Sequence, residues 1–147
     1  MSVEPRQLDF LEALDRPPIP VPSPDLARRR RGALAHAAGE AAEEAALRLY
    51  RMQGARLVAR RFRRRGVGEI DLILELGGRL VFCEVKSRRT IEEAAAAITP
   101  RQWSRLEAAA NAYIMEHGVS ARTDLRFDVV LADRHGGVEI LENAHPY

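Results

Sequence analysis

Apolar residues along this chain follow two spacings, one typical of helices and one typical of strands. Between about residues 33 and 53 they recur at helical spacing from Leu34 to Met52, which predicts a helix that ends at Gly54. Shorter, β-branched and apolar runs at 55–62, 69–76 and 79–86 predict three strands.

The second half of the chain predicts a further helix and two more strands. In Thr99-Pro-Arg-Gln102, threonine is a good N-cap, proline suits the first helical turn and glutamine could complete a capping box, so a helix should run from here to Gly118. A shorter helix is expected at 91–98, and strands at 125–131 and 138–141. This order of elements predicts a mixed α/β fold in which helices cover a central sheet.

A proline-rich segment sets the N-terminus apart from the rest. Six of the eight prolines fall within residues 5–24, and four arginines follow at Arg28–Arg31. Residues 1–30 are therefore expected to form a flexible Pro/Arg-rich arm, and residues 31–147 a single compact domain. The arginines of the arm could touch DNA phosphates, although a solvated tail is the simpler interpretation.

Composition narrows the class of protein. The net charge is only +2, but the pI near 9.1 and several arginine clusters indicate local basic surfaces. The single Cys83 excludes an internal disulfide, and no apolar run is long enough for a membrane span, so we expect a cytoplasmic protein without membrane contact. The four histidines lack zinc-ligand spacing, and nucleotide-binding glycine motifs are missing from the sequence.

The strands at 69–76 and 79–86 predict a charged hairpin. If Gly77-Gly78 forms a two-residue turn, Leu76 lies opposite Arg79 and Asp71 lies opposite Glu84. Because side chains alternate along strands, Lys86 then shares the face of both carboxylates. Facing carboxylates repel each other, and a divalent cation between them would remove that penalty.

Lys86 is the only lysine among 23 Lys and Arg residues. Since arginine supplies positive charge elsewhere, this position is expected to need a compact ammonium group. A plainer alternative is a solvated cross-strand salt bridge between Glu69 and Lys86. Apolar residues on both faces of these strands indicate a central position in the sheet, where charges are paired or bind metal, and this favours the metal site.

Three sequence motifs resemble a known family. Gly68-Glu-Ile-Asp-Leu-Ile73, Phe82-Cys-Glu-Val-Lys-Ser-Arg88 and Arg126-Phe-Asp-Val-Val130 look like the YraN-like family of bacterial proteins. That family is similar to Holliday-junction resolvases of the restriction-endonuclease-like PD-(D/E)xK superfamily. Gly39-Glu40 and Thr99-Pro100-Arg101 match it too, so the resemblance covers about residues 33–145. It implies a restriction-endonuclease-like mixed sheet flanked by helices.

The resemblance also implies roles for individual residues. Asp71 and Glu84 would hold Mg²⁺ or Mn²⁺ together with the carbonyl oxygen of Val85. Lys86 would orient or deprotonate the attacking water, and Glu40 would reach the metal from the first helix. The candidate DNA-binding residues are Arg63, Arg64, Arg65, Arg88 and Arg101. Asp128 is expected to have a structural or supporting role. The family often has lysine at position 102, where this chain has glutamine.

Two functions are consistent with these residues, and a third, weaker alternative is a purely structural α/β domain with a charged hairpin. The first is a metal-dependent DNA endonuclease, acting on branched or recombination-intermediate DNA. The second is a catalytically inert nuclease-fold protein that binds nucleic acid as an accessory. The intact set of Asp71, Glu84 and Lys86 favours the first. A homodimer is one expected arrangement, because proteins that act on two-fold DNA substrates are often dimers.

Overall fold

The computed structural model describes residues 21 and 23–145, which fall into two units that divide after Ala33. Most of the predicted proline-rich arm lies outside the described residues. The helix α2 runs from Pro24 to Met52, so the start predicted near residue 33 was wrong, and Arg28–Arg31 are helical.

The early start of α2 has a local cause. The Ser23 hydroxyl oxygen accepts a hydrogen bond from the amide of Leu26 at 3.2 Å, as an N-cap does. Pro24 then occupies the first helical position, where its missing N–H costs nothing, and Asp25 places a carboxylate in the first turn. These signals are present in the sequence but are masked by the run of prolines before them.

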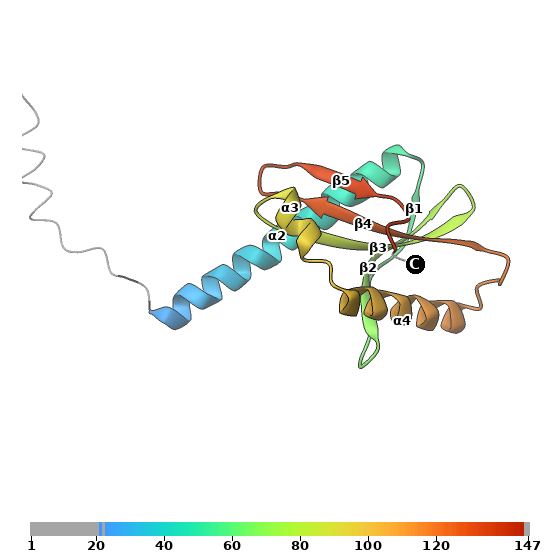
Figure 1. Cartoon of the computed structure of the whole chain (residues 1–147), viewed down its shortest axis with the longest axis horizontal. Helices are drawn as coiled ribbons and strands as arrows, with labels where there is room; N and C mark the ends of the chain where they lie inside the picture. The colour runs from blue at the N-terminus through green and yellow to red at the C-terminus, as the bar shows by residue number, and fades with distance from the viewer. Residues whose placement is uncertain (1–20, 22, 146–147) are drawn as a thin grey trace, which may run out of the picture. The chain divides into compact units, whose positions relative to one another are not determined.

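Within the described residues, five strands form one mixed sheet in the order β1-β2-β3-β4-β5, seen side by side in Figure 1. Only β3 and β4 pair in parallel, because α3 and α4 connect them, and the other neighbours are antiparallel. This confirms the predicted mixed α/β sheet flanked by helices, which is consistent with a restriction-endonuclease-like fold. The bounds are Arg56–Arg64 (β1), Gly68–Leu76 (β2), Arg79–Ser87 (β3), Asp124–Ala132 (β4) and Val138–Leu141 (β5), with helices at Ile91–Ala96 (α3) and Pro100–His117 (α4).

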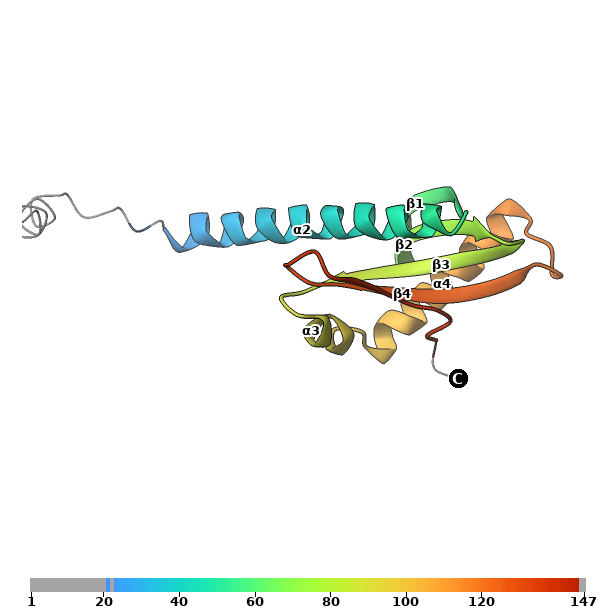
Figure 2. The ribbon, with the colours of Figure 1, turned by 90° about the horizontal axis from the view of Figure 1, so that it is seen from above.

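Helices cover both faces of the sheet (Figure 2). On one face, Leu47 and Tyr50 of α2 are buried against β2, β3 and β4. On the other face, Leu106 and Tyr113 of α4 pack against the first three strands, and Ala94 of α3 packs against β4. The central strands β2 and β3 are therefore buried on both faces, as their apolar composition predicted.

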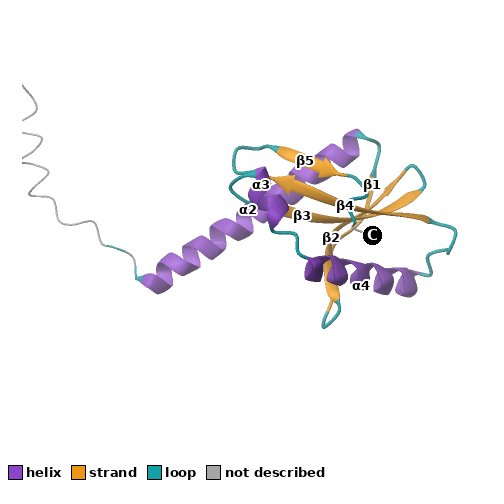
Figure 3. Cartoon of the chain, viewed as in Figure 1, coloured by secondary structure: helices purple, strands orange, loops and turns teal. Residues whose placement is uncertain are grey.

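The ends of α4 follow the predicted capping signals. The Thr99 hydroxyl accepts from the amide of Gln102 at 3.2 Å, and Gly118 ends the helix with a φ of 59°, in the left-handed region. The predicted capping box is only half formed, because the Gln102 side chain turns elsewhere, as described below. A short loop joins α3 to this end of α4 (Figure 3).

Gly68, the first residue of β2, lies unusually close to α4. A Cβ atom at this position would be 2.1 Å from the carbonyl oxygen of Arg105, so a larger residue would force the strand and the helix apart. Within the described residues, no helix combines the length and the apolar character that a membrane crossing requires.

Candidate active site

The predicted hairpin register is correct along the outer part of β2 and β3. Leu76 pairs with Arg79, Leu74 with Val81 and Leu72 with Cys83. At the next position the backbone ladder ends, and the side chain of Asp71 takes over: its Oδ2 accepts a hydrogen bond from the Val85 amide at 2.7 Å. Asp71 is thus held against β3 at the point where the two strands stop pairing.

Asp71 and Glu84 form a close carboxylate pair. Burial, followed by the negative charge of Glu84, raises the pKa of Asp71, and the hydrogen bond from the Val85 amide opposes them; the resulting pKa is about 8. The raised pKa means that Asp71 holds a proton at neutral pH unless a cation compensates its charge. The pair has the chemistry that a divalent cation requires, because a bound cation would compensate its buried negative charge.

Lys86 lies beside Glu84 on the same strand. Its Nζ is 2.8 Å from Glu84 Oε1, and the two side chains are only 13% and 15% exposed. The alternative in which Lys86 pairs with Glu69 was wrong, because Glu69 binds Arg63 at 2.8 Å instead. The lysine ammonium is consequently held inside the site and next to a carboxylate.

Gln102 is a contact of Lys86 that the sequence did not predict. In the orientation of the Gln102 side-chain amide that gives both its oxygen and its nitrogen a partner, the oxygen accepts a hydrogen bond from Lys86 Nζ at 2.8 Å. The nitrogen donates to the Ala97 carbonyl at 2.9 Å. The first turn of α4 thus reaches the end of β3. Only the three-dimensional packing of α4 reveals this contact, because the sequence spacing favoured a capping role.

The acidic residues of α2 meet Asp71 in one cavity of about 600 Å³, lined also by Arg61 and Arg63. The predicted Glu40 lines this cavity, but its side chain is 49% exposed and pairs with Arg61. Glu43 is only 12% exposed, and its charge contributes to the raised pKa of Asp71. Glu43, one helical turn beyond the predicted Glu40, is therefore the more buried of the two carboxylates in this cavity, and its charge acts on Asp71.

The carboxylates fit a metal site of the kind that magnesium uses. In the described part of the chain, no three or more His, Cys, Asp and Glu side chains are already gathered in a metal-binding arrangement. Magnesium commonly uses one or two protein carboxylates and fills its other positions with water and substrate phosphate. Asp71 and Glu84 meet that requirement, and the Val85 amide, which donates to Asp71, places the backbone of Val85 beside the pair.

Comparison with known proteins gives the family. A model of "Uncharacterised protein family UPF0102" matches residues 42–132. The chain belongs to the UPF0102 family. It is 45% identical over 123 residues to a UPF0102 protein of Azorhizobium caulinodans, an alignment that covers 84% of this chain and 93% of that protein. A UPF0102 protein of Ruegeria pomeroyi is 48% identical over 114 residues, covering 78% and 92% of the two chains.

UPF0102 is the YraN family that the motifs resembled, so the family assignment is confirmed. The matched segment contains β2, β3 and β4 and therefore Asp71, Glu84 and Lys86. It begins at Ala42, so it includes Glu43 and excludes Glu40.

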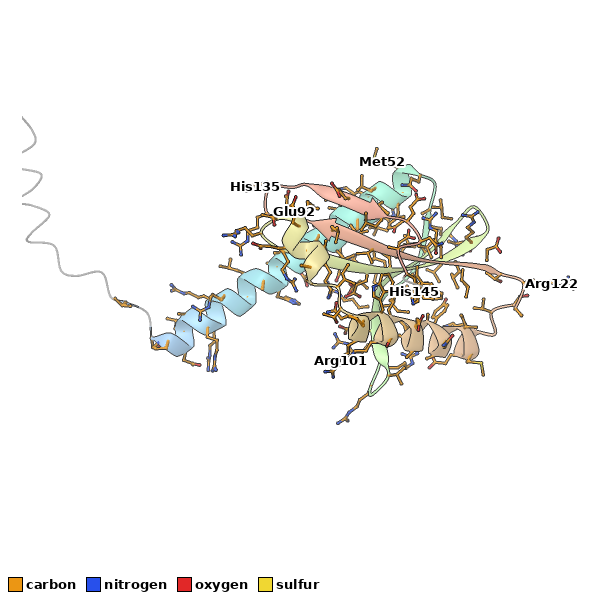
Figure 4. All side chains as sticks on the ribbon, viewed as in Figure 1. Met52, Glu92, Arg101, Arg122, His135 and His145 are labelled. Carbon is orange, nitrogen blue, oxygen red and sulfur yellow. The ribbon has the colours of Figure 1, made fainter. Side chains whose placement is uncertain are left out.

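The predicted DNA-binding arginines of this UPF0102 chain differ in their surroundings. Arg63 is engaged by Glu69, and Arg64 is bound by Glu116 through its Nε at 2.6 Å and lies over the Phe62 ring. The other three are exposed and form no ion pair with any described residue: Arg65, Arg88 and Arg101. Arg101 lies at the first turn of α4 (Figure 4), next to Gln102.

Asp128 on β4 has the structural role expected for it. It is fully buried and accepts hydrogen bonds from Tyr50 Oη at 2.7 Å, from Arg126 Nε at 2.9 Å and from the Asn143 amide at 2.9 Å. Cys83 is buried beside it, and burial raises the pKa of its thiol well above the ordinary value.

Proposed function

We propose that this UPF0102 protein is a metal-dependent DNA endonuclease of the PD-(D/E)xK type. The observation that supports it most is the carboxylate pair of Asp71 and Glu84, with the lone lysine of the chain 2.8 Å from Glu84. A domain that only needs to fold has no use for two close, largely buried carboxyl groups, because keeping both charged is unfavourable and one of them must take up a proton.

Each residue of the set has a distinct proposed role. Asp71 and Glu84 hold Mg²⁺ or Mn²⁺ with the Val85 carbonyl, and Glu43, rather than the expected Glu40, supports the site from α2. The bound ion would polarise the scissile phosphate and lower the pKa of a water molecule. Lys86 orients that water and stabilises the negative charge that develops on the phosphate oxygens.

Gln102 is proposed to position Lys86. A lysine side chain is flexible, but the Nζ of Lys86 is held on one side by Glu84 and on the other by the amide oxygen of Gln102. The amide is itself held by the Ala97 carbonyl. These two acceptors fix the ammonium group before substrate arrives, which lowers the cost of ordering it during the reaction.

The proposed substrate is DNA with branches or recombination intermediates, as the motif resemblance to resolvases implies. Arg65, Arg88 and Arg101 are proposed as phosphate contacts, since they are exposed and unpaired within the described residues. We also propose a cytoplasmic location and a homodimer matched to a two-fold substrate.

One observation favours the second candidate, an accessory that binds nucleic acid without cutting it. Glu84 already has a cation in Lys86, and Glu43 is paired with Arg61 at 3.1 Å. If these pairs are stable, the carboxylates are not free for metal, and the exposed arginines alone would bind phosphate.

Cleavage assays separate the two candidates. Labelled linear, flap and four-way-junction DNA is incubated with the protein and Mg²⁺, Mn²⁺ or EDTA, with Asp71→Ala and Lys86→Ala variants in parallel. Glu75→Ala is the matched control, because Glu75 lies on the same strand but pairs with Arg56 at the surface. Metal-dependent cutting that both site variants lose, and the control keeps, supports the nuclease. Binding without cutting at moderate salt supports the accessory.

A further inference from the structure

Arg61 on β1 has an unusual backbone conformation. Its φ is 51°, in the left-handed region that residues other than glycine and asparagine seldom adopt. The neighbouring pairs Arg60 with Leu72 and Phe62 with Ile70 are formed, so Arg61 occupies the gap in the ladder opposite Asp71. A strained residue facing a candidate site in this way calls for a functional explanation.

The Arg61 guanidinium binds two carboxylates of α2. Its Nε is 3.1 Å from Glu43 Oε2, and its Nη2 is 3.3 Å from Glu40 Oε1. All three residues line the cavity that contains Asp71. Arg61 is therefore the positive charge that lies nearest to Glu43 on the cavity side, although its own side chain remains 48% exposed.

Stability alone does not account for this arrangement. Glu43 has a second partner in Arg60, at 3.5 Å. Half-exposed ion pairs contribute only about 0–1 kcal/mol, and a non-glycine residue in the left-handed region costs on the order of 1–3 kcal/mol. The Arg61 ion pairs thus do not clearly offset the strain of the backbone that makes them.

We propose that Arg61 is an internal cation that competes with the metal ion for Glu43. Arg61 and the proposed ion would bind the same carboxylate, because Glu43 and Arg61 line the cavity that contains Asp71. An ion at Asp71 and Glu84 would therefore have to displace Arg61 from Glu43. Arg61 is then a positioning residue that lowers metal affinity. The inference rests on the proposed metal site and adds an arginine-controlled third carboxylate to it.

If Arg61 competes with the metal ion, removing its charge should increase the affinity for the metal. The loss of a residue with only a structural role would not have this effect. Binding of Mn²⁺ is measured by electron paramagnetic resonance or calorimetry on the full chain. Arg61→Asn is the main variant, because asparagine tolerates the left-handed conformation while removing the charge. Arg61→Lys keeps the charge, and Arg56→Gln removes an arginine of the same strand that pairs outside the cavity.

We expect Arg61→Asn to bind Mn²⁺ about two- to fivefold more tightly, the effect of one partly exposed ion pair. Arg61→Lys and Arg56→Gln should bind nearly as the wild type does. In a Glu43→Gln background, affinity should be weaker and the Arg61→Asn change should have no further effect. If a folded Arg61→Asn protein binds Mn²⁺ with unchanged or weaker affinity, the inference is overturned. It is also overturned if Arg61→Asn increases the Mn²⁺ affinity equally in the Glu43→Gln background.

An Asp71→Asn variant shows whether a negative result disproves the role of Arg61 or the proposed metal site itself. If Asp71→Asn abolishes Mn²⁺ binding but Arg61→Asn leaves it unchanged, the metal site stands and only the role of Arg61 is wrong. If neither the wild type nor Arg61→Asn binds Mn²⁺, both proposals are overturned. If Arg61→Asn binds Mn²⁺ and the wild type does not, the result supports both the metal site and the role of Arg61.

Discussion

Asp71 and Asp128 are both aspartates inside the same sheet, but they differ in how many donors reach them. Asp128 accepts from the Tyr50 hydroxyl, from two nitrogens of Arg126 and from the Asn143 amide. Asp71 accepts from the Val85 amide and faces the negative charge of Glu84. A buried carboxylate with a full set of donors stabilises the fold, whereas one with few donors and a negative neighbour is ready to bind a cation.

The largest expected effect concerns Asp128. Changing Asp128→Ala leaves the buried Arg126 charge and the Tyr50 hydroxyl without their acceptor, so we expect a loss of about 3–5 kcal/mol in the free energy of unfolding. Urea denaturation measures this. Equal losses in Asp128→Ala and Asp71→Ala would remove the contrast between the two aspartates.

The second effect is a pH dependence at Asp71. An unfolded aspartate has a pKa near 3.9, whereas that of folded Asp71 is about 8. Between these values the folded state binds the extra proton, so the stability of the wild type falls as pH rises. The stability of Asp71→Asn should rise relative to wild type across this window, by at most about 1.4 kcal/mol for each pH unit.

Denaturation curves at pH 5, 6, 7 and 8, all in EDTA, test this dependence. Asp128→Asn is the matched comparison, since it removes a carboxylate from the satisfied network. The prediction is contradicted if the free energies of unfolding of the wild type and of Asp71→Asn change with pH in the same way over this range. Asp71 would then not have a raised pKa in the folded protein.

Metal should relieve the carboxylate pair and leave the Asp128 network unchanged. Mg²⁺ or Mn²⁺ at ten times its dissociation constant is expected to stabilise the wild type by about 1.4 kcal/mol, and chelation should reverse this. Thermal unfolding with and without metal checks the shift, which Tyr50→Phe should keep and Asp71→Asn should lose. A metal shift retained in Asp71→Asn would place the ion elsewhere.

The effect expected for Tyr50→Phe is about as large as that of the metal. This change removes one of several donors to Asp128, so a loss of about 1–2 kcal/mol is expected. Denaturation with urea measures it, and DNA cleavage by the variant should stay near the wild-type rate. A larger loss than that of Asp128→Ala would mean that Tyr50 acts mainly through packing.

Local rules predicted the elements that depend on neighbouring residues. Gly77-Gly78 set the hairpin register, Thr99 began α4 and Gly118 ended it. The face shared by Asp71, Glu84 and Lys86 follows from strand alternation alone. These features need no knowledge of how helices pack on the sheet, and that is why the sequence was sufficient for them.

The missed features depend on contacts between elements. Glu40 and Glu43 lie on neighbouring turns of one helix, and only the way α2 lies on the sheet decides which one acts on Asp71. Likewise, the side chain of Gln102 could cap its own helix or reach Lys86, and the packing of α4 selects the second. The left-handed backbone of Arg61 has no signal in its residue type.

The hydrogen bond from Val85 to Asp71 also makes one amide proton a reporter of the whole site. Because this N–H is bonded to a side chain rather than to a backbone carbonyl, its exchange with solvent deuterium depends on whether the aspartate stays in place. A cation that anchors Asp71 would slow that exchange without any change in the neighbouring ladder. Occupancy of the site could therefore be followed at a single backbone position, in the absence of DNA and of turnover.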